Sequence, residues 1–296
     1  MTQESPKIAE ADEQLGIDQL IDQYKNSEDF VHRAKTENSQ SAYNLDLRQF
    51  GKFCQTHEIL ALAQLTPQVM SEWVDEMKTG DYKLASINRK LASMKEGFFD
   101  WLIVRGSVSQ DFKIDLPDYF KTQRRPAEIL KFSQIRKLIN AIKKEDLRAA
   151  ALVQIALKTG GKTSEIVQMK TQDVLIDPTN DQVLVRLSTP GKNNGRTIIL
   201  DREAGETIKE YLQETRVKPD EYLFTNKRGK NKKTEHLSRQ GFWSILEQYG
   251  REIGLPNLNP QILRNTFIVN FRGDVKELSD ILGMSLSNAT KVRSLI

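Results

Sequence analysis

The sequence is poor in the residues that build disulfides and metal centres. Its 296 residues include one cysteine, Cys54, and three histidines, His32, His57 and His236, which lie in different segments. One cysteine excludes an internal disulfide, and three scattered histidines lack the number and spacing of ligands that a metal site needs. We therefore expect no metal and no other cofactor, and we expect Cys54 to pack as a small apolar side chain.

Long apolar runs are also missing. No stretch approaches the roughly 20 apolar residues that cross a bilayer. The first 16 residues have neither the basic start nor the apolar centre of a signal peptide. These absences favour a cytoplasmic protein without a membrane partner. With 38% hydrophobic and 28% charged residues, the chain is long enough for two domains with buried cores.

Charge is unevenly distributed along the chain. Lysines and arginines number 44 against 40 aspartates and glutamates, which gives a net charge of +4. Residues 1–30 hold eight acidic side chains and two lysines, so the remainder carries 42 basic against 32 acidic side chains. This excess of positive charge favours a polyanionic partner, although charge alone also suits an ordinary solvated surface.

The first part of the chain predicts an all-α domain. Residues 1–15 are polar and acidic without periodicity, so we expect them to be disordered. Over residues 16–114, apolar side chains recur at helical spacing in four segments that begin near Ile17, Ser39, Thr66 and Ala85. Four helices with short connections form a small helical domain. Residues 115–130 contain prolines and bases without a period, as is typical of a linker.

Residues 131–296 predict a second domain that combines helices with a β-hairpin. Residues 149–157 are almost uniformly apolar and predict a buried helix, which Gly160 would end because glycine adopts positive φ. Residues 183–187 and 197–200 predict two short strands, joined by a turn that holds Lys192. Residues 225–233 form the densest basic run and include Lys227 and Arg228. Such a run is either a solvated surface or a binding loop.

Four segments resemble the tyrosine recombinase, or phage integrase, family, and most closely its Xer-type members. Residues 41–47 and 82–89 are similar to the core-binding helices, and residues 223–243 to the approach to the catalytic His-x-x-Arg segment. Residues 282–293 fit, without a gap, the segment that ends in the nucleophilic tyrosine. The resemblance implies a mainly α fold with a small β-sheet, in which an all-α, SAM-like core-binding domain precedes an α+β domain of the catalytic type. It also implies double-stranded DNA as the partner.

The resemblance further implies six groups around one scissile phosphate. In the family, two arginines hold the phosphate oxygens, a histidine and a lysine handle protons, a histidine or tryptophan donates a hydrogen bond, and a tyrosine attacks phosphorus. This sequence keeps the hairpin lysine and the second arginine as Lys192 and Arg264. It departs at the other four positions, which hold Lys162, Gln261, Met284 and Arg293.

These departures predict a degenerate active site. Arginine stays protonated and cannot form the covalent phosphoprotein that the family's tyrosine forms. We therefore expect that the chain is not an enzyme but a pseudo-recombinase, whose cations Lys162, Lys192, Arg264 and Arg293 hold a phosphate without cutting. Two alternatives stay open. One is an active site-specific recombinase in which Ser285, Ser287 or Ser294 replaces the tyrosine, and the other is a protein-interaction module that reuses the fold.

The expected function is that of a regulatory or architectural factor for transcription or the nucleoid, which clamps double-stranded DNA between its two domains. Helices of the first domain would approach the major groove, while the second domain follows the backbone. The DNA-binding residues that we predict are Arg48, Asn88, Arg89 and Lys90 in the first domain and Lys162, Lys192, Arg196, Lys227, Arg228, Arg264 and Arg293 in the second.

The resemblance also bears on assembly. Family members continue beyond the tyrosine with a helix that docks on a neighbouring subunit, whereas this sequence ends three residues after Arg293. We therefore expect no C-terminal helix exchange of the usual kind. A protein partner, or self-association by another surface, stays open.

Overall fold

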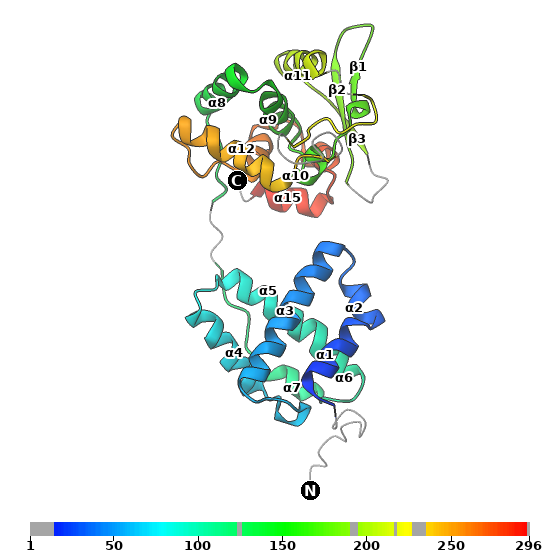
Figure 1. The fold of residues 1–296 in the computed structure, drawn as a ribbon, viewed down its shortest axis with the longest axis vertical. Coiled ribbons are helices and arrows are strands. Elements are labelled where there is room, and N and C mark those ends of the chain that lie inside the picture. The colour runs from blue at the N-terminus through cyan, green and yellow to red at the C-terminus, as the bar shows by residue number, and fades with distance from the viewer. Residues whose placement is uncertain (1–14, 123–125, 190–194, 216–217, 227–234, 295–296) are drawn as a thin grey trace. The chain divides into compact units, whose positions relative to one another are not determined.

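The computed structural model of the chain divides into two compact units, Met1–Arg124 and Arg125–Ile296 (Figure 1). The structure describes residues 15–122, 126–189, 195–215, 218–226 and 235–294. The division falls within residues 115–130, where the sequence predicts a linker, and the domain bounds themselves stay a prediction. The segment predicted to be disordered, residues 1–15, lies outside the described residues except for Leu15.

The first unit is built from helices alone within its described residues. Its long helices are α1 (Ile17–Lys25), α3 (Glu37–Thr56), α4 (Pro67–Thr79) and α5 (Leu84–Ser93). The shorter elements are α2 (Glu28–Arg33), η1 (Leu62–Gln64), η2 (Met94–Phe98), α6 (Phe99–Val104) and α7 (Gln110–Ile114). The sequence predicted four helices and missed α2 and α7, because five or six residues are too few to show an apolar period.

One predicted helix of the first unit contains a π-turn. The helix expected from Ala85 runs through α5, η2 and α6, and η2 is the π-helical turn. The guanidinium of Arg33 donates to the carbonyl oxygens of Ala92, at 3.0 Å, and Glu96. A π-turn frees helical carbonyls, so this side chain supplies the donors that the helix lacks there.

The first unit has an aromatic core. Phe50, Phe98 and Phe99 are fully buried, and the Phe50 ring lies 5.1 Å from the Trp73 ring. Cys54 is buried beside them, and burial raises the pKa of its thiol to about 12. The prediction that Cys54 packs as a core residue is therefore confirmed.

The second unit combines helices with a small sheet. Its helices are α8 (Phe132–Glu145), α9 (Leu147–Thr159), α10 (Thr163–Val167), η3 (Thr171–Asp173), α11 (Arg202–Thr215), α12 (Arg239–Glu252), α13 (Pro260–Asn270), α14 (Val275–Leu282) and α15 (Leu286–Ser294). Helix α9 is buried almost throughout and contacts α8, α11 and α13. Gly160 ends it with φ of 57°, as predicted.

The sheet has three antiparallel strands in the order β1-β2-β3, and Figure 1 shows it at one edge of the unit beside α11. The strands are β1 (Val174–Ile176), β2 (Val183–Leu187) and β3 (Arg196–Ile199). Val185 on β2 lies opposite Val174 on β1 and Ile198 on β3. The sequence predicted only the hairpin of β2 and β3. It missed β1 because three partly exposed residues give no alternation.

The architecture confirms the predicted fold class, which is mainly α with a small β-sheet. No helix in the described ranges is long and apolar enough to cross a membrane.

Candidate nucleic-acid interface

A buried carboxylate organises the basic side chains of the second unit. Glu165 on α10 is 2% exposed and accepts hydrogen bonds from the Lys162 amide at 2.9 Å and the Thr189 hydroxyl at 2.8 Å. The Arg196 guanidinium donates to both of its oxygens, at 3.2 and 2.7 Å. Burial alone would raise the pKa of Glu165. The hydrogen bonds from Arg196, Lys162 and Thr189 outweigh burial and hold this pKa below its ordinary value.

Arg264 on α13 adds a second guanidinium to this group. It is 8% exposed and donates to the carbonyl oxygen of Gly160, the residue that ends α9. Burial lowers the pKa of Arg264, and Arg196 lowers it further, while the opposite charge of Glu165 raises it. Arginine nevertheless stays charged in proteins, so a cation is held in a place that penalises its charge.

Lys162 is the most accessible cation of the cluster. Its ammonium lies 3.9 Å from the Glu165 carboxylate, and 44% of its side chain is exposed. The structure therefore brings three predicted residues, Lys162, Arg196 and Arg264, around Glu165. Three cations and one carboxylate leave an excess of positive charge, which suits an anion such as a phosphate.

Three other predicted positions have different surroundings. Gln261 is exposed and donates to the Asn265 side chain at 2.8 Å. Met284 is half-buried and packs against the small apolar cluster of Ile268, Leu278 and Leu282. Arg293 is exposed and donates to the carbonyl oxygen of Gly273 at 2.8 Å. Within the described part of the chain, Arg293 forms no hydrogen bond or ion pair with the Glu165 cluster.

Three predicted DNA-binding residues, Lys192, Lys227 and Arg228, lie outside the described residues. Lys192 belongs to the hairpin tip, residues 190–194, and the other two belong to the basic run, residues 227–234. Their roles therefore stay predictions from sequence.

Three of the four predicted contacts of the first unit, Asn88, Arg89 and Lys90, bond to other residues of that unit. Asp46 on α3 is fully buried and accepts from Arg89 at 2.8 Å and from Lys90 at 3.0 Å. Lys90 is 2% exposed and also donates to Gln49. The Asn88 amide exchanges two hydrogen bonds of 2.8 Å with the backbone of Phe120. Lys90 cannot reach a phosphate from this position, which differs from the expectation that it faces DNA.

Two predicted residues of the first unit keep accessible polar groups. Arg48 is exposed and forms no ion pair within the described residues. The Arg89 side chain is 42% exposed although it bonds to Asp46. These two remain available to a partner, whereas Asn88 and Lys90 have structural partners.

Sequence reasoning missed the two carboxylates, Asp46 and Glu165. A signal existed for Glu165, because it stands at the third position of α10 and accepts from the amide of Lys162, the residue before the helix. No such signal marks Asp46, which lies in the middle of α3. Both were hidden because an acidic residue among helical polar residues usually faces solvent.

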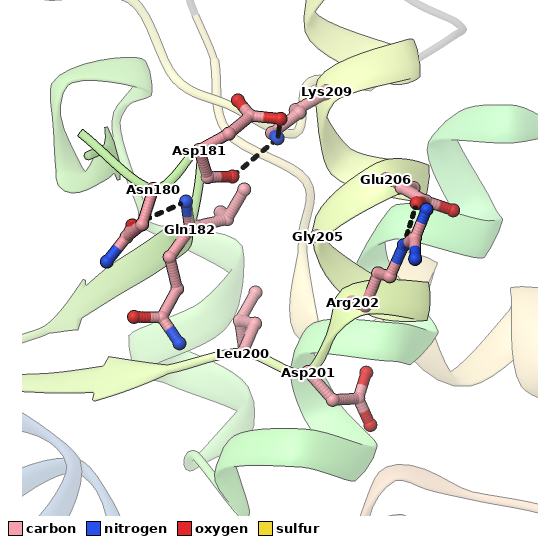
Figure 2. A pocket seen from close by; sticks show the side chains of 10 residues that line it. Asn180, Asp181, Gln182, Leu200, Asp201, Arg202, Gly205, Glu206 and Lys209 are labelled. Carbon is pink, nitrogen blue, oxygen red and sulfur yellow. Dashed lines mark hydrogen bonds and ion pairs between the residues drawn. The ribbon is translucent and has the colours of Figure 1, made fainter. Parts of the chain in front are cut away.

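A polar pocket elsewhere in the second unit is explained by internal ion pairs (Figure 2). It has a volume of about 500 Å³ and lies between the start of β2, the end of β3 and α11. Figure 2 shows Lys209 against Asp181 and Arg202 against Glu206. Asp201 pairs with Lys158 at 2.5 Å. Its charged groups are thus all paired within the protein, and no group of three or more potential metal ligands occurs in the described ranges.

Comparison with known proteins identifies the family. Residues 128–292 match the phage integrase family, and residues 22–106 match the SAM-like N-terminal domain of phage integrases. The first match alone covers more than half of the chain. The chain belongs to the phage integrase family.

Relatives and solved structures extend this likeness. The tyrosine recombinase XerC of Roseiflexus castenholzii is 27% identical over 274 residues, which cover 88% of this chain and 83% of the relative. The tyrosine recombinase XerD of Rickettsia conorii is 26% identical over 282 residues, which cover 88% and 89%. A lambda integrase dimer bound to a core site matches with a TM-score of 0.73 and 14% identity, over 96% of this chain and 78% of that one. The XerH recombinase bound to its difH substrate matches with a TM-score of 0.66 and 20% identity, over 86% and 76%.

The phage integrase comparisons correct one expectation. We expected that the chain is not an enzyme, and this is wrong, because the relatives that match most of its length are named as recombinases, which are enzymes. The expectation relied on the residue type at single aligned positions, above all Arg293. The structural matches, at 20% identity or less, establish the fold.

Proposed function

We propose that this phage integrase family member binds double-stranded DNA and acts in DNA recombination or its regulation. The observation that carries the proposal is the cluster of Lys162, Arg196 and Arg264 around the single carboxylate of Glu165. Relatives named as tyrosine recombinases support it, as do structural neighbours that were solved with DNA bound.

Arg264 is the strongest candidate for a phosphate contact. A guanidinium has five N–H donors, and the only protein acceptor for Arg264 within the described residues is the Gly160 carbonyl. Burial has already removed most of its water. A phosphate oxygen would supply the missing acceptor and also the missing negative charge. Lys162, partly exposed beside the same carboxylate, would add a second charged contact.

The remaining contacts that we propose are accessible basic side chains. Arg293 is exposed on α15, and Arg48 and Arg89 present their charges on the first unit. Lys192, Lys227 and Arg228 join the proposal on their sequence positions alone. Asn88 and Lys90 are omitted because their polar groups bond within the first unit.

We also propose that the site differs from the family pattern at Lys162, Gln261, Met284 and Arg293. The Gln261 amide does not ionise and so cannot carry a proton as a histidine does, and the Met284 thioether cannot donate a hydrogen bond. A regulatory or architectural role, at the nucleoid in the cytoplasm, fits a site that binds phosphate through cations.

A second candidate function is strand cleavage by a hydroxyl other than tyrosine. The names of the relatives favour recombination, and three hydroxyls, those of Ser285, Ser287 and Ser294, are exposed beside or within α15. A serine at this site would need a base to accept its proton.

Binding is tested by fluorescence anisotropy with a labelled duplex of about 30 base pairs over a range of salt concentrations. We expect the affinity to fall steeply, by about a hundredfold or more between roughly 50 and 200 mM salt, because several phosphate contacts release counterions. No association with any duplex at the lowest salt would reject the proposal. A map of DNA bound in the source organism would then identify the process served.

The two roles are separated by incubation with nicked suicide substrates. A covalent DNA adduct on a denaturing gel, mapped to one serine by mass spectrometry, would establish cleavage. Tight binding without an adduct would favour the regulatory role.

A further inference from the structure

The structure assigns Arg196 the role of a positioning residue, which holds three segments of the proposed phosphate site together through Glu165. This inference rests on the proposed DNA-binding function and changes the part that Arg196 plays in it. Sequence analysis placed Arg196 among the DNA contacts. Its surroundings instead make it the link between the hairpin, α10 and the end of α14.

All three nitrogens of the Arg196 guanidinium bond within the protein. Nη1 and Nη2 donate to the two oxygens of Glu165 at 3.2 and 2.7 Å, and Nε donates to the carbonyl oxygen of Ile281. Only 10% of the side chain is exposed. A phosphate therefore cannot receive the paired N–H groups with which arginine grips two oxygens.

The same carboxylate anchors both ends of the hairpin tip. Thr189 lies just before residues 190–194, and its hydroxyl donates to Glu165 at 2.8 Å. Arg196 follows the tip and opens β3. The tip carries Lys192, one of the proposed phosphate contacts. Glu165 thus bonds to a residue on each side of residues 190–194, and it bonds to the Lys162 amide as well.

Arg196 also reaches the segment that leads to α15. Ile281 is next to the last residue of α14, and Gly283 ends that helix with φ of 58°. A Cβ at Gly283 would lie 3.0 Å from Nη1 of Arg196, so the missing side chain leaves room for the guanidinium. A cation is favoured there because the last carbonyls of a helix carry partial negative charge. The hydrogen bond from Arg196 to Ile281 therefore fixes the end of α14, from which the chain continues through Met284 into α15.

The direction in which one substitution changes DNA affinity distinguishes a positioning role of Arg196 from a direct contact with DNA. Glu165→Gln removes a negative charge close to the proposed phosphate site, and it releases Arg196 from its ion pair. If Arg196, Lys162 and Arg264 bound DNA through their charge alone, the loss of the Glu165 negative charge would make DNA binding tighter. Since Glu165 instead positions the site, we expect binding at about 100 mM salt to weaken by about tenfold, through the loss of one or two phosphate contacts.

Two matched variants accompany this test. Glu206→Gln on α11 removes the same charge from an exposed pair with Arg202, and we expect unchanged or slightly tighter binding. Thr189→Val keeps shape and charge but removes one hydrogen bond to Glu165, so we expect binding to weaken about twofold to threefold. The valine variant also decides the question if Glu165→Gln does not fold.

Two further measurements accompany this test: a conservative substitution of Arg196, and local hydrogen exchange, whose pattern differs from that of a general loss of stability. Arg196→Lys keeps the charge but cannot reach Glu165 and Ile281 together, and we expect it to bind DNA as weakly as Arg196→Gln. Without DNA, amide exchange should accelerate in residues 187–189, 195–199 and 281–286 of the Thr189→Val variant, while α9 stays unchanged.

The inference is overturned if Glu165→Gln binds as tightly as the unmodified protein or tighter, or if exchange at the hairpin is unaltered in Thr189→Val. Failure of the unmodified protein to bind any duplex would remove the proposed function instead. The exchange measurement needs no DNA and would still decide whether Arg196 positions the hairpin.

Discussion

Among the described residues, each unit contains one buried carboxylate that pairs with a lysine and an arginine, and the two clusters differ in which basic groups stay accessible. Asp46 in the first unit is fully buried with Lys90, which donates to Gln49 as well. Glu165 in the second unit leaves Lys162 partly exposed. Arg264 lies in the same charge cluster, and the described residues give it one acceptor, the Gly160 carbonyl.

This difference separates basic residues that close a fold from basic residues that can receive a ligand. In the first unit the ion pairs join α3 to α5, and the ammonium of Lys90 has two acceptors and almost no contact with solvent. In the second unit, the three cations Lys162, Arg196 and Arg264 lie around one carboxylate, that of Glu165. An anion can complete the second cluster at Lys162 and Arg264, whereas Lys90 in the first cluster already has its acceptors, and there Arg89 is the cation with an exposed side chain.

The largest effect is expected from breaking the first cluster. Asp46→Asn leaves the buried Lys90 charge without a counter-charge, so the free energy of unfolding of the first unit should fall by about 3–5 kcal/mol. Hydrogen exchange of α3 and α5 amides reports this unit separately from the other.

The control for this variant is Asp75→Asn, which breaks the exposed pair with Lys78 on α4. It should cost less than about 1 kcal/mol, as exposed ion pairs do. Equal losses in the two variants would contradict a structural role for the Asp46 cluster.

The next largest effect is expected from replacing a glycine that has positive φ, and the two units can be compared in the stability that each loses. Gly160→Ala should destabilise the second unit by about 2–4 kcal/mol, because positive φ costs about 1–2 kcal/mol and the added Cβ would overlap the Phe267 ring. Gly106 in the first unit has φ of 73°, and an added Cβ would meet no atom of the described residues within 4 Å, so Gly106→Ala should carry the backbone cost alone. Urea unfolding of both variants, followed by circular dichroism, measures the difference.

A third variant tests whether Arg264 of the second cluster contacts a DNA phosphate. Arg264→Lys keeps the charge and loses the planar fork, so DNA affinity should fall about tenfold, the loss of one charged hydrogen bond. Arg251→Lys on α12, where the arginine is exposed and pairs with Glu247, is the matched control and should bind normally. Anisotropy titrations compare the two, and equal affinities would remove Arg264 from the phosphate site.

The smallest expected effect is a loss of stability at high pH, and it should be the same in both units. Burial raises the pKa of Tyr24 in the first unit and of Tyr211 in the second to about 12. A raised pKa stabilises the fold below pH 10 and loses that contribution as the pH rises from about 10 to 12. At pH 11 each tyrosine should account for about 1 kcal/mol of lost stability. Ultraviolet absorbance titration checks the pKa values, and a shift in one unit alone would contradict this symmetry.

The elements with long apolar periods could be predicted from the sequence. The buried helix at residues 149–157, its end at Gly160 and the hairpin of β2 and β3 are confirmed. The short helices α2 and α7 and the three-residue strand β1 escaped, since so few residues carry no period. The π-turn at Met94–Phe98 escaped as well, because it depends on a guanidinium from α2.

The sequence by itself determined the fold class, the family resemblance and which positions of the family pattern hold cations. Only the tertiary structure decided what those cations do. Lys90 and Arg196 read as DNA contacts because both are basic and lie in the expected segments, yet each meets a buried carboxylate distant in the sequence, Asp46 or Glu165. A side chain's charge is set by its own chemistry, whereas its availability depends on which residues folding brings beside it.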